Sequence, residues 1–289
     1  MTVSELNRHI IATLTPVLGR GEAGSAARII WDDVLHYTPA QIVIRGDHRL
    51  EPFTQEHIDE LLRRVCAGEP LQYAIGSARF MGMDLKVTPD PLIPRPETAG
   101  LVDLITDRFG QRADLRVLDV GTGSGCIALA LSRALRFADI DAMDISQAAL
   151  DVARENAETL GCNINLIPAD ALQLPACGLS EVKNTPQTYD IIASTPPYVL
   201  DSEATEMDAR VLDHEPKTAL FVPDSDPLKF YRPISEYARK ALRPGGMLFF
   251  EINPKEVAAM SKMLYGLGFG NVEIHNDYLG RKRFATAAV

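Results

Sequence analysis

About the first seventy residues carry apolar side chains at every third or fourth position, which is the spacing of one helix face. The first such segment follows Ser4, a residue type that caps helix N-termini. Its apolar positions are Leu6, Ile10, Leu14 and Leu18. A second segment spans 22–37, and a third runs from Thr54 to Gly68. Short polar links separate these segments, so we expect a small helical bundle at the N-terminus.

The pattern changes after Glu69-Pro70. Residues 77–88 alternate loosely between apolar and polar side chains around Gly82, which predicts a β-hairpin. Prolines at 91, 94 and 96 then favour an extended lead-in to a helix over about 97–109.

From about residue 115, short apolar runs alternate with amphipathic segments, which predicts β-strands alternating with α-helices. Strands are expected at 116–120, 140–144, 164–168, 189–194, 246–252, 271–276 and 282–287. Helices are expected through Leu135, from Ser146 to about 160, and near 227–242 and 254–266. This order predicts an α/β fold with a mainly parallel, Rossmann-like sheet covered on both faces. The link between the last two strands is short, so the last strand should run antiparallel.

The composition is that of a folded globular protein: 46% of the 289 residues are hydrophobic and 24% are charged. At about 150 residues per domain, this length fits two domains. We expect a helical domain over 1–75, a hairpin linker over 76–95 and an α/β domain over 96–289. No apolar run approaches the roughly 18 residues that span a bilayer, and the first residues lack a signal-peptide pattern. We therefore expect a cytoplasmic protein that does not bind membranes.

Charge and cysteine spacing narrow the possible partners. A formal net charge of -10 disfavours nucleic acid, because that interaction depends on neutralising phosphates with cations. The one compact basic stretch, Arg281-Lys282-Arg283, is expected to be a solvated strand end.

The cysteines have no CxxC spacing, and the histidines are dispersed, so we expect buried thiols in a reducing compartment and no metal site. These cysteines are Cys66, Cys126, Cys162 and Cys177.

The strongest local motif lies between the strand predicted at 116–120 and the helix after it. It reads Asp119-Val120-Gly121-Thr122-Gly123-Ser124-Gly125. Glycines let the backbone turn sharply and let a ligand approach closely. Dinucleotide-binding folds have G-x-G-x-x-G at this place, whereas here the third glycine comes one residue earlier. The G-x-G-x-G form resembles motif I of S-adenosylmethionine-dependent methyltransferases.

Two acidic residues at later strand ends suit the same ligand. Asp144 ends the next strand and is placed to accept hydrogen bonds from both ribose hydroxyls. Asp170 follows the strand after that and is placed to accept from the adenine amino group, beside Ala171. The alternative is that the glycines only form a tight turn and that Asp144 only caps a helix. Three features in register at successive strand ends favour a cofactor site.

The fourth strand ends in Ser194-Thr195-Pro196-Pro197-Tyr198, which resembles the [D/N/S]-P-P-[Y/F] motif of amino-group methyltransferases. A planar amide nitrogen is a poor nucleophile because its lone pair is delocalised. Acceptors at Thr195 and the Pro196 carbonyl can hold both N–H bonds, while the prolines stiffen the turn and Tyr198 packs on the flat group. In-line displacement with late proton loss then needs no strong base. The alternative is a proline-rich turn with a core tyrosine.

Together these motifs resemble the HemK/PrmC family, the peptide-chain release factor N5-glutamine methyltransferases. The segments that carry the resemblance are Glu69 to Tyr73, Phe80-Met81-Gly82, Leu92 to Thr98, Val117 to Gly125, Thr195 to Tyr198, Glu215-Pro216, Ala219-Leu220, Pro244-Gly245-Gly246, Asp277, Gly280 and Arg283.

The resemblance implies a class I methyltransferase sheet, S-adenosyl-L-methionine as cofactor and an N-terminal domain that helps to grip a protein substrate. The implied substrate is the glutamine of a Gly-Gly-Gln loop in class I release factors, and the implied substrate contacts are at Thr195, Pro196, Pro197 and Tyr198. The implied cofactor contacts are at Gly121, Thr122, Gly123, Ser124, Gly125, Asp144, Ala171 and Thr195.

Three positions depart from the family pattern. The family has Asn where this chain has Thr195, whose hydroxyl is a shorter acceptor and also a donor. Ala99 replaces an acidic residue, and Asn253-Pro254-Lys255 stands where the family has Gly and a nearby Gln.

Two other functions stay open on the sequence. One is methylation of an adenine or other nucleobase amino group. The other is a catalytically weakened module that binds the cofactor and docks a translation protein. The roles of Arg95 and Glu97 are also open, because they either position the acceptor loop or form a structural ion pair.

Overall fold

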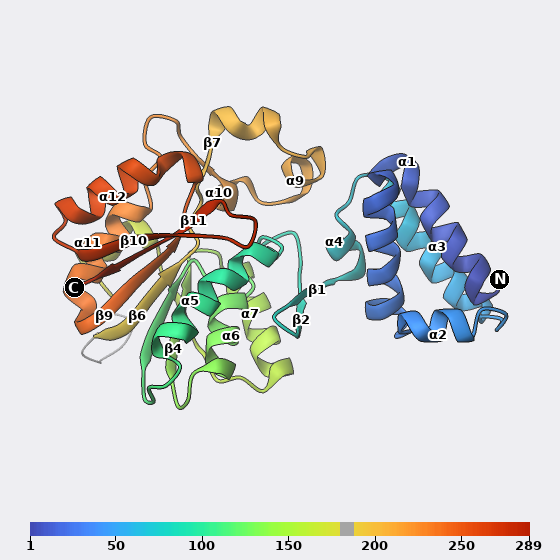
Figure 1. Cartoon of the computed structure of the whole chain (residues 1–289), viewed down its shortest axis with the longest axis horizontal. Helices are drawn as coiled ribbons and strands as arrows, with labels where there is room; N and C mark the ends of the chain where they lie inside the picture. The colour runs from blue at the N-terminus through green and yellow to red at the C-terminus, as the bar shows by residue number, and fades with distance from the viewer. Residues whose placement is uncertain (180–187) are drawn as a thin grey trace. The chain divides into compact units, whose positions relative to one another are not determined.

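The computed structural model describes residues 1–179 and 188–289, which divide into two compact units (Figure 1). One unit contains Met1–Ser77 and the short segment Asp208–His214. The other contains Ala78–Met207 and Glu215–Val289. The domain boundaries expected from the sequence stay a prediction.

The first unit is built from helices, as the apolar spacing predicts. They are α1 (Val3–Ile29), α2 (Pro39–Ile44), α3 (Pro52–Cys66), α4 (Leu71–Ile75) and α9 (Ala209–His214). The cap of α1 is Thr2 rather than Ser4, because the Thr2 hydroxyl accepts from the Glu5 amide at 3.2 Å. α1 contains Pro16, but its backbone departs from helical geometry at Gly19, which has a φ of 76°. The predicted apolar positions pack with α3 in one core.

The second unit contains a seven-stranded sheet within the described residues, in the order β10-β11-β9-β6-β3-β4-β5. Its strands are β3 (Arg116–Val120), β4 (Asp139–Asp144), β5 (Asn165–Pro168), β6 (Tyr189–Ser194), β9 (Leu242–Glu251), β10 (Gly270–Asn276) and β11 (Lys282–Ala288). Of these seven described strands, only β11 runs in the opposite direction to the others, which confirms the predicted topology. β9 begins four residues before the expected 246, since Leu242 already pairs with Tyr189 ahead of a register shift.

Helices cover both faces of this sheet (Figure 1). One face packs on α5 (Ala99–Phe109), α6 (Cys126–Ala134) and α7 (Gln147–Leu160). The other packs on α8 (Leu174–Cys177), α11 (Tyr231–Ala241) and α12 (Val257–Gly266). Alternate strand residues belong to the two cores: Val117 to the first and Leu118 to the second.

Smaller elements surround the sheet. The predicted hairpin forms from β1 (Ser77–Phe80) and β2 (Met83–Lys86). The sequence pattern did not reveal the short parallel pair β7 (Val199–Leu200) and β8 (Phe221–Val222), nor α10 (Lys217–Leu220), because runs of two to four residues carry no periodicity. Within the described residues, no helix is both long enough and apolar enough to cross a membrane.

The sheet topology brings several chain segments to one edge. β3 lies between β4 and β6, and its last residue Val120 is in register with both Met143 and Ser194. Parallel neighbours end on the same side, so the loops after β3, β4, β5 and β6 all start there. These loops, together with Asp144 at the end of β4, contain every residue predicted for the site.

Candidate active site

The glycine loop Gly121–Gly125 joins β3 to α6 and is held mainly by its own backbone. All three glycines have positive φ, at 75°, 56° and 83° for Gly121, Gly123 and Gly125, a region that other residues rarely adopt. The amides of Gly121 and Thr122 both donate to the Met143 carbonyl at 2.9 Å, which ties the loop to the end of β4.

The first and last of these glycines serve different purposes. A Cβ built at Gly125 would lie 3.2 Å from the Cβ of Ala153 and from Cδ1 of Leu129, so this glycine permits close packing of α6 on α7. Among the described atoms, nothing lies within 4 Å of a Cβ built at Gly121. The open side of Gly121 therefore leaves room for a ligand.

The two predicted acids lie at the same edge as the loop. The Asp144 carboxylate accepts from the amides of Gly123 and Ser146, each at 2.9 Å. Asp170 accepts from the Leu172 amide at 2.8 Å and so starts a short 3₁₀ turn that contains Ala171. A carboxylate has about four lone-pair positions, so both acids retain acceptors for a ligand. The cap of α7 is Ser146, whose hydroxyl accepts from the Ala149 amide at 3.2 Å, so the alternative that Asp144 caps this helix is wrong.

Asp119 is a site residue that sequence reasoning quoted in the motif but did not assign. Its side chain is fully buried at the end of β3 and accepts from the Thr122 hydroxyl at 2.7 Å. Its other oxygen, Oδ1, has no hydrogen-bond partner among the described residues. Burial raises the pKa of Asp119 to about 7, against the opposing effect of the Thr122 hydrogen bond. The signal that could have found it is an acid at a buried strand end directly before the glycines.

The acceptor loop Thr195–Tyr198 starts where β6 ends. The Ser194 hydroxyl donates to the Val120 carbonyl at 2.7 Å and so joins this loop to the start of the glycine loop. Within residues 1–179 and 188–289, no hydrogen bond engages the Thr195 hydroxyl. The Tyr198 hydroxyl points to protein partners: it donates to Oε1 of Glu251 and accepts from Nη1 of Arg283, both at 3.1 Å. The core-tyrosine interpretation is therefore correct for the hydroxyl end of this side chain.

Two family models match this chain, one in the helical N-terminal part and one in the part that contains the sheet. A PrmC N-terminal domain model matches residues 5–76, and a methyltransferase domain model matches residues 117–213. A release factor glutamine methyltransferase of Bacteroides thetaiotaomicron is 40% identical over 285 residues, covering 99% of each chain. The chain belongs to the release factor glutamine methyltransferase family.

Other relatives agree with this assignment. A release factor glutamine methyltransferase of Flavobacterium psychrophilum is 33% identical over 98% of each chain. A solved methyltransferase of Pyrococcus furiosus has a TM-score of 0.51 at 19% identity, over 82% of this chain and 98% of that one, and this likeness shows the fold alone. The family resemblance and the class I methyltransferase sheet expected from the sequence are confirmed.

Glu215 connects two of the segments that carry the resemblance to the release factor glutamine methyltransferase family. Its contacts with Arg95 and Ile93 are called the Glu215 clip below. The buried Glu215 carboxylate accepts from Nη2 of Arg95 at 2.6 Å and from the Ile93 amide at 3.3 Å. Arg95 thus forms an ion pair with Glu215. The Glu97 side chain has no hydrogen bond or ion pair with the described residues.

Two expectations about side-chain burial were wrong. In the basic stretch, Arg281 and Lys282 are exposed as expected, but Arg283 is not, because its side chain is only 13% exposed and lies near the carboxylates of Glu251 and Asp277. Cys66 is exposed rather than buried, because it ends α3 at the surface, while Cys126 and Cys162 are partly buried. Side-chain details of Cys177 lie outside the described residues.

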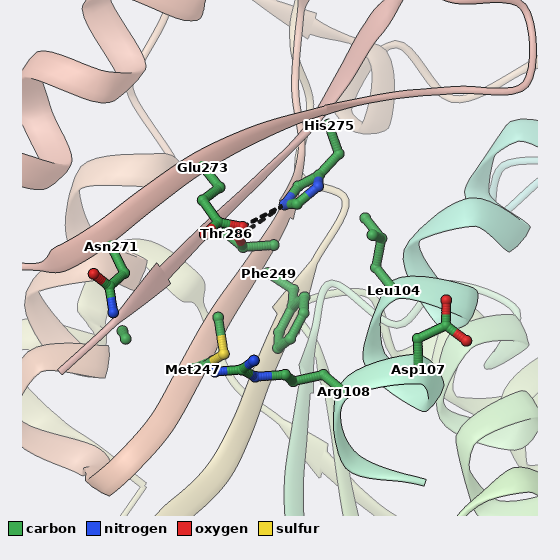
Figure 2. Close-up of a pocket in the computed structure, with 10 residues that line it drawn as sticks. Leu104, Asp107, Arg108, Met247, Phe249, Asn271, Glu273, His275 and Thr286 are labelled. Atoms are coloured by element: carbon green, nitrogen blue, oxygen red, sulfur yellow. Dashed lines mark hydrogen bonds and ion pairs between the residues drawn. The ribbon is translucent and has the colours of Figure 1, made fainter.

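A separate groove of about 260 Å³ lies between α5 and strands β9, β10 and β11 (Figure 2). Figure 2 shows His275 of β10 turned toward Thr286 of β11, to which its Nε2 is hydrogen-bonded at 3.0 Å. None of the predicted site residues lines this groove. It is therefore not the site that the family motifs predict.

Proposed function

We propose that this protein transfers a methyl group from S-adenosylmethionine to the side-chain amide nitrogen of the glutamine in the Gly-Gly-Gln loop of class I release factors. One observation carries the proposal: the glycine loop and the acceptor loop leave two hydrogen-bonded parallel strands at residues in register, Val120 and Ser194. A donor held by the first loop and an amide held by the second would therefore be neighbours.

The residues present suit the cofactor. The open face of Gly121 admits a ligand against the backbone, together with Thr122, Gly123 and Ser124. The remaining lone pairs of Asp144 suit ribose hydroxyls, and Asp170 with Ala171 suits the adenine edge. Asp119 Oδ1 is a further buried acceptor without a partner among the described residues. When bound, S-adenosylmethionine supplies an electrophilic methyl group on a sulfonium.

The acceptor loop orients the amide. The Thr195 hydroxyl and the Pro196 carbonyl would accept the two N–H bonds, which directs the nitrogen lone pair out of that plane. Pro196 and Pro197 stiffen the turn, and the Tyr198 ring offers a flat apolar surface for the carboxamide. The nitrogen would attack the methyl group in line, so that the new N–C bond forms as the sulfur–methyl bond breaks and S-adenosylhomocysteine leaves. The nitrogen would then release one proton to solvent. No side chain of high basicity is needed.

The net charge of -10 favours this protein substrate over a base in a nucleic acid, because the phosphate backbone of that nucleic acid would be repelled. The relatives described above are release factor glutamine methyltransferases, which favours release factors as the substrate class.

A direct test is mass spectrometry of both class I release factors after incubation with the full chain and S-adenosylmethionine. We expect a mass gain of one methylene group on the glutamine of Gly-Gly-Gln. A matched control is the same release factor with that glutamine changed to asparagine, which should stay unmodified. Absence of product on both release factors would reject the proposal.

A further inference from the structure

Tyr198 is fixed at both ends of the residue. Its backbone carbonyl accepts from Nδ2 of Asn253 at 3.1 Å. Its hydroxyl lies between Glu251 and Arg283, and the guanidinium carbon of Arg283 lies 5.9 Å from the ring centroid. Because the backbone carbonyl and the side-chain hydroxyl of Tyr198 are both held, its ring keeps one orientation. The flat face of the ring is therefore presented in one direction only.

Glu251 is the centre of this anchor. It is the last residue of β9 and only 2% exposed. Its two carboxylate oxygens have different partners: Oε2 accepts from the Thr98 hydroxyl at 2.8 Å, and Oε1 accepts from the Tyr198 hydroxyl. Its own carbonyl accepts from the Tyr231 hydroxyl at 2.8 Å. Glu251 thus joins the family segment that ends in Thr98 to the acceptor loop.

Arg283 completes the cluster from the last strand. Its Nη1 donates to the Tyr198 hydroxyl and lies 3.9 Å from Oε1 of Glu251, while its Nε lies 3.7 Å from Oδ2 of Asp277. A hydroxyl that accepts from the guanidinium has its proton directed at the carboxylate. The order of donors therefore fixes the hydrogen-bond chain as Arg283 to Tyr198 to Glu251.

We propose that Glu251 is a positioning residue for methyl transfer, which holds the Tyr198 ring in the orientation that packs on the acceptor amide. This inference rests on the proposed function. Glu251 itself lies behind the ring, on the hydroxyl side, and acts through Tyr198. Its loss should lower the rate of the transfer step and leave cofactor binding intact, because misplacing an acceptor by about 1 Å can cost on the order of 100-fold in rate.

A purely structural role would have a different signature, and Asp190 provides the matched control. Asp190 is also a buried carboxylate of the sheet, 5% exposed, and pairs with Arg112 and Arg243 at 3.0 Å. It is the second residue of β6, at the opposite end of the strand from the acceptor loop. D190N therefore removes a similar buried charge without touching the Tyr198 anchor.

The experiment compares the full-length wild type, Y198F, E251Q, Y198F/E251Q and D190N. Methyl transfer to an intact release factor gives kcat and KM, and calorimetry gives the dissociation constant of S-adenosylmethionine. We expect kcat to fall by about 10- to 100-fold in E251Q, with the dissociation constant within about twofold of wild type. The double variant should fall by much less than the product of the two single effects, because both remove one hydrogen-bond chain. D190N should lower the melting temperature and keep kcat within about twofold.

The inference fails if E251Q keeps the wild-type kcat, if the two single effects multiply in the double variant, or if D190N loses as much kcat as E251Q. Crystal structures of E251Q and D190N provide a readout that does not depend on the substrate. We expect the Tyr198 ring to change orientation in E251Q alone. An unchanged ring and an unchanged Arg283 contact in E251Q would overturn the inference, whereas a wild type that methylates neither release factor would reject only the proposed function.

Discussion

The glycine loop and the acceptor loop start from neighbouring strand ends but are held by different means. The glycine loop is held by positive-φ glycines and by amides that bond to Met143 and Asp144 on the next strand. The acceptor loop is held by side chains distant in sequence, with Glu251 53 residues and Arg283 85 residues from Tyr198. Substitutions in the first should therefore act through backbone strain and ligand binding, and those in the second through side-chain orientation.

The largest loss of stability is expected from a substitution within the glycine loop. Gly125→Ala forces a Cβ into contact with α7 at a φ of 83° and should cost roughly 4 kcal/mol of unfolding free energy, through strain and overpacking together. Gly121→Ala meets only the cost of its φ, about 1 kcal/mol, and should chiefly weaken S-adenosylmethionine binding. Denaturant unfolding and calorimetry separate the two effects. Equal losses of stability would contradict the different purposes assigned to these glycines.

The buried acid beneath the glycine loop predicts a pH dependence. The folded-state pKa of Asp119, about 7, lies above the unfolded value of 3.8, so its contribution to stability is complete below about pH 4 and is lost as the pH rises through 7. Asp119→Asn removes this titration. The stability of that variant relative to wild type should therefore increase by about 3 kcal/mol between pH 5 and pH 8. Urea unfolding of both proteins measures this difference. A relative stability that stays constant from pH 5 to pH 8 would show that the pKa of Asp119 is not raised in the folded protein.

The Glu215 clip should contribute less to stability than the two features above. Glu215→Ala removes a buried acceptor from Arg95 and from the Ile93 amide, and we expect a loss of about 2 kcal/mol. Glu60→Ala is the matched control, since it breaks an ion pair of the same 2.6 Å length between exposed side chains on α3. Its melting temperature should equal that of wild type. If the two variants melt alike, the clip adds nothing to stability.

The smallest effect is expected at the position where this chain departs from its family. Thr195→Asn restores a longer carbonyl acceptor and should raise the methylation rate by about threefold, with the S-adenosylmethionine affinity unchanged. Single-turnover kinetics on a release factor would measure it. A fall of about tenfold or more would mean that the hydroxyl is better suited to this site than an amide.

Local patterns predicted most of the sheet and the glycine loop. Strands β3 and β6 have the predicted bounds, because each is a short, mainly apolar run that is followed within two residues by glycine or proline. The anchor of Tyr198 could not be predicted in this way. It depends on β11 pairing with β9, which brings Arg283 beside Glu251, and a basic stretch gives no sign of such a partner.

The central claim is that the glycine loop holds the methyl donor while the acceptor loop orients the amide. It is tested most directly by Tyr198→Ala, with the methylation rate at saturating S-adenosylmethionine and the cofactor dissociation constant measured on the same preparation. We predict a rate fall on the order of 100-fold, with a dissociation constant within about twofold of wild type. A wild-type rate, or a loss of rate matched by an equal loss of cofactor affinity, would contradict the claim.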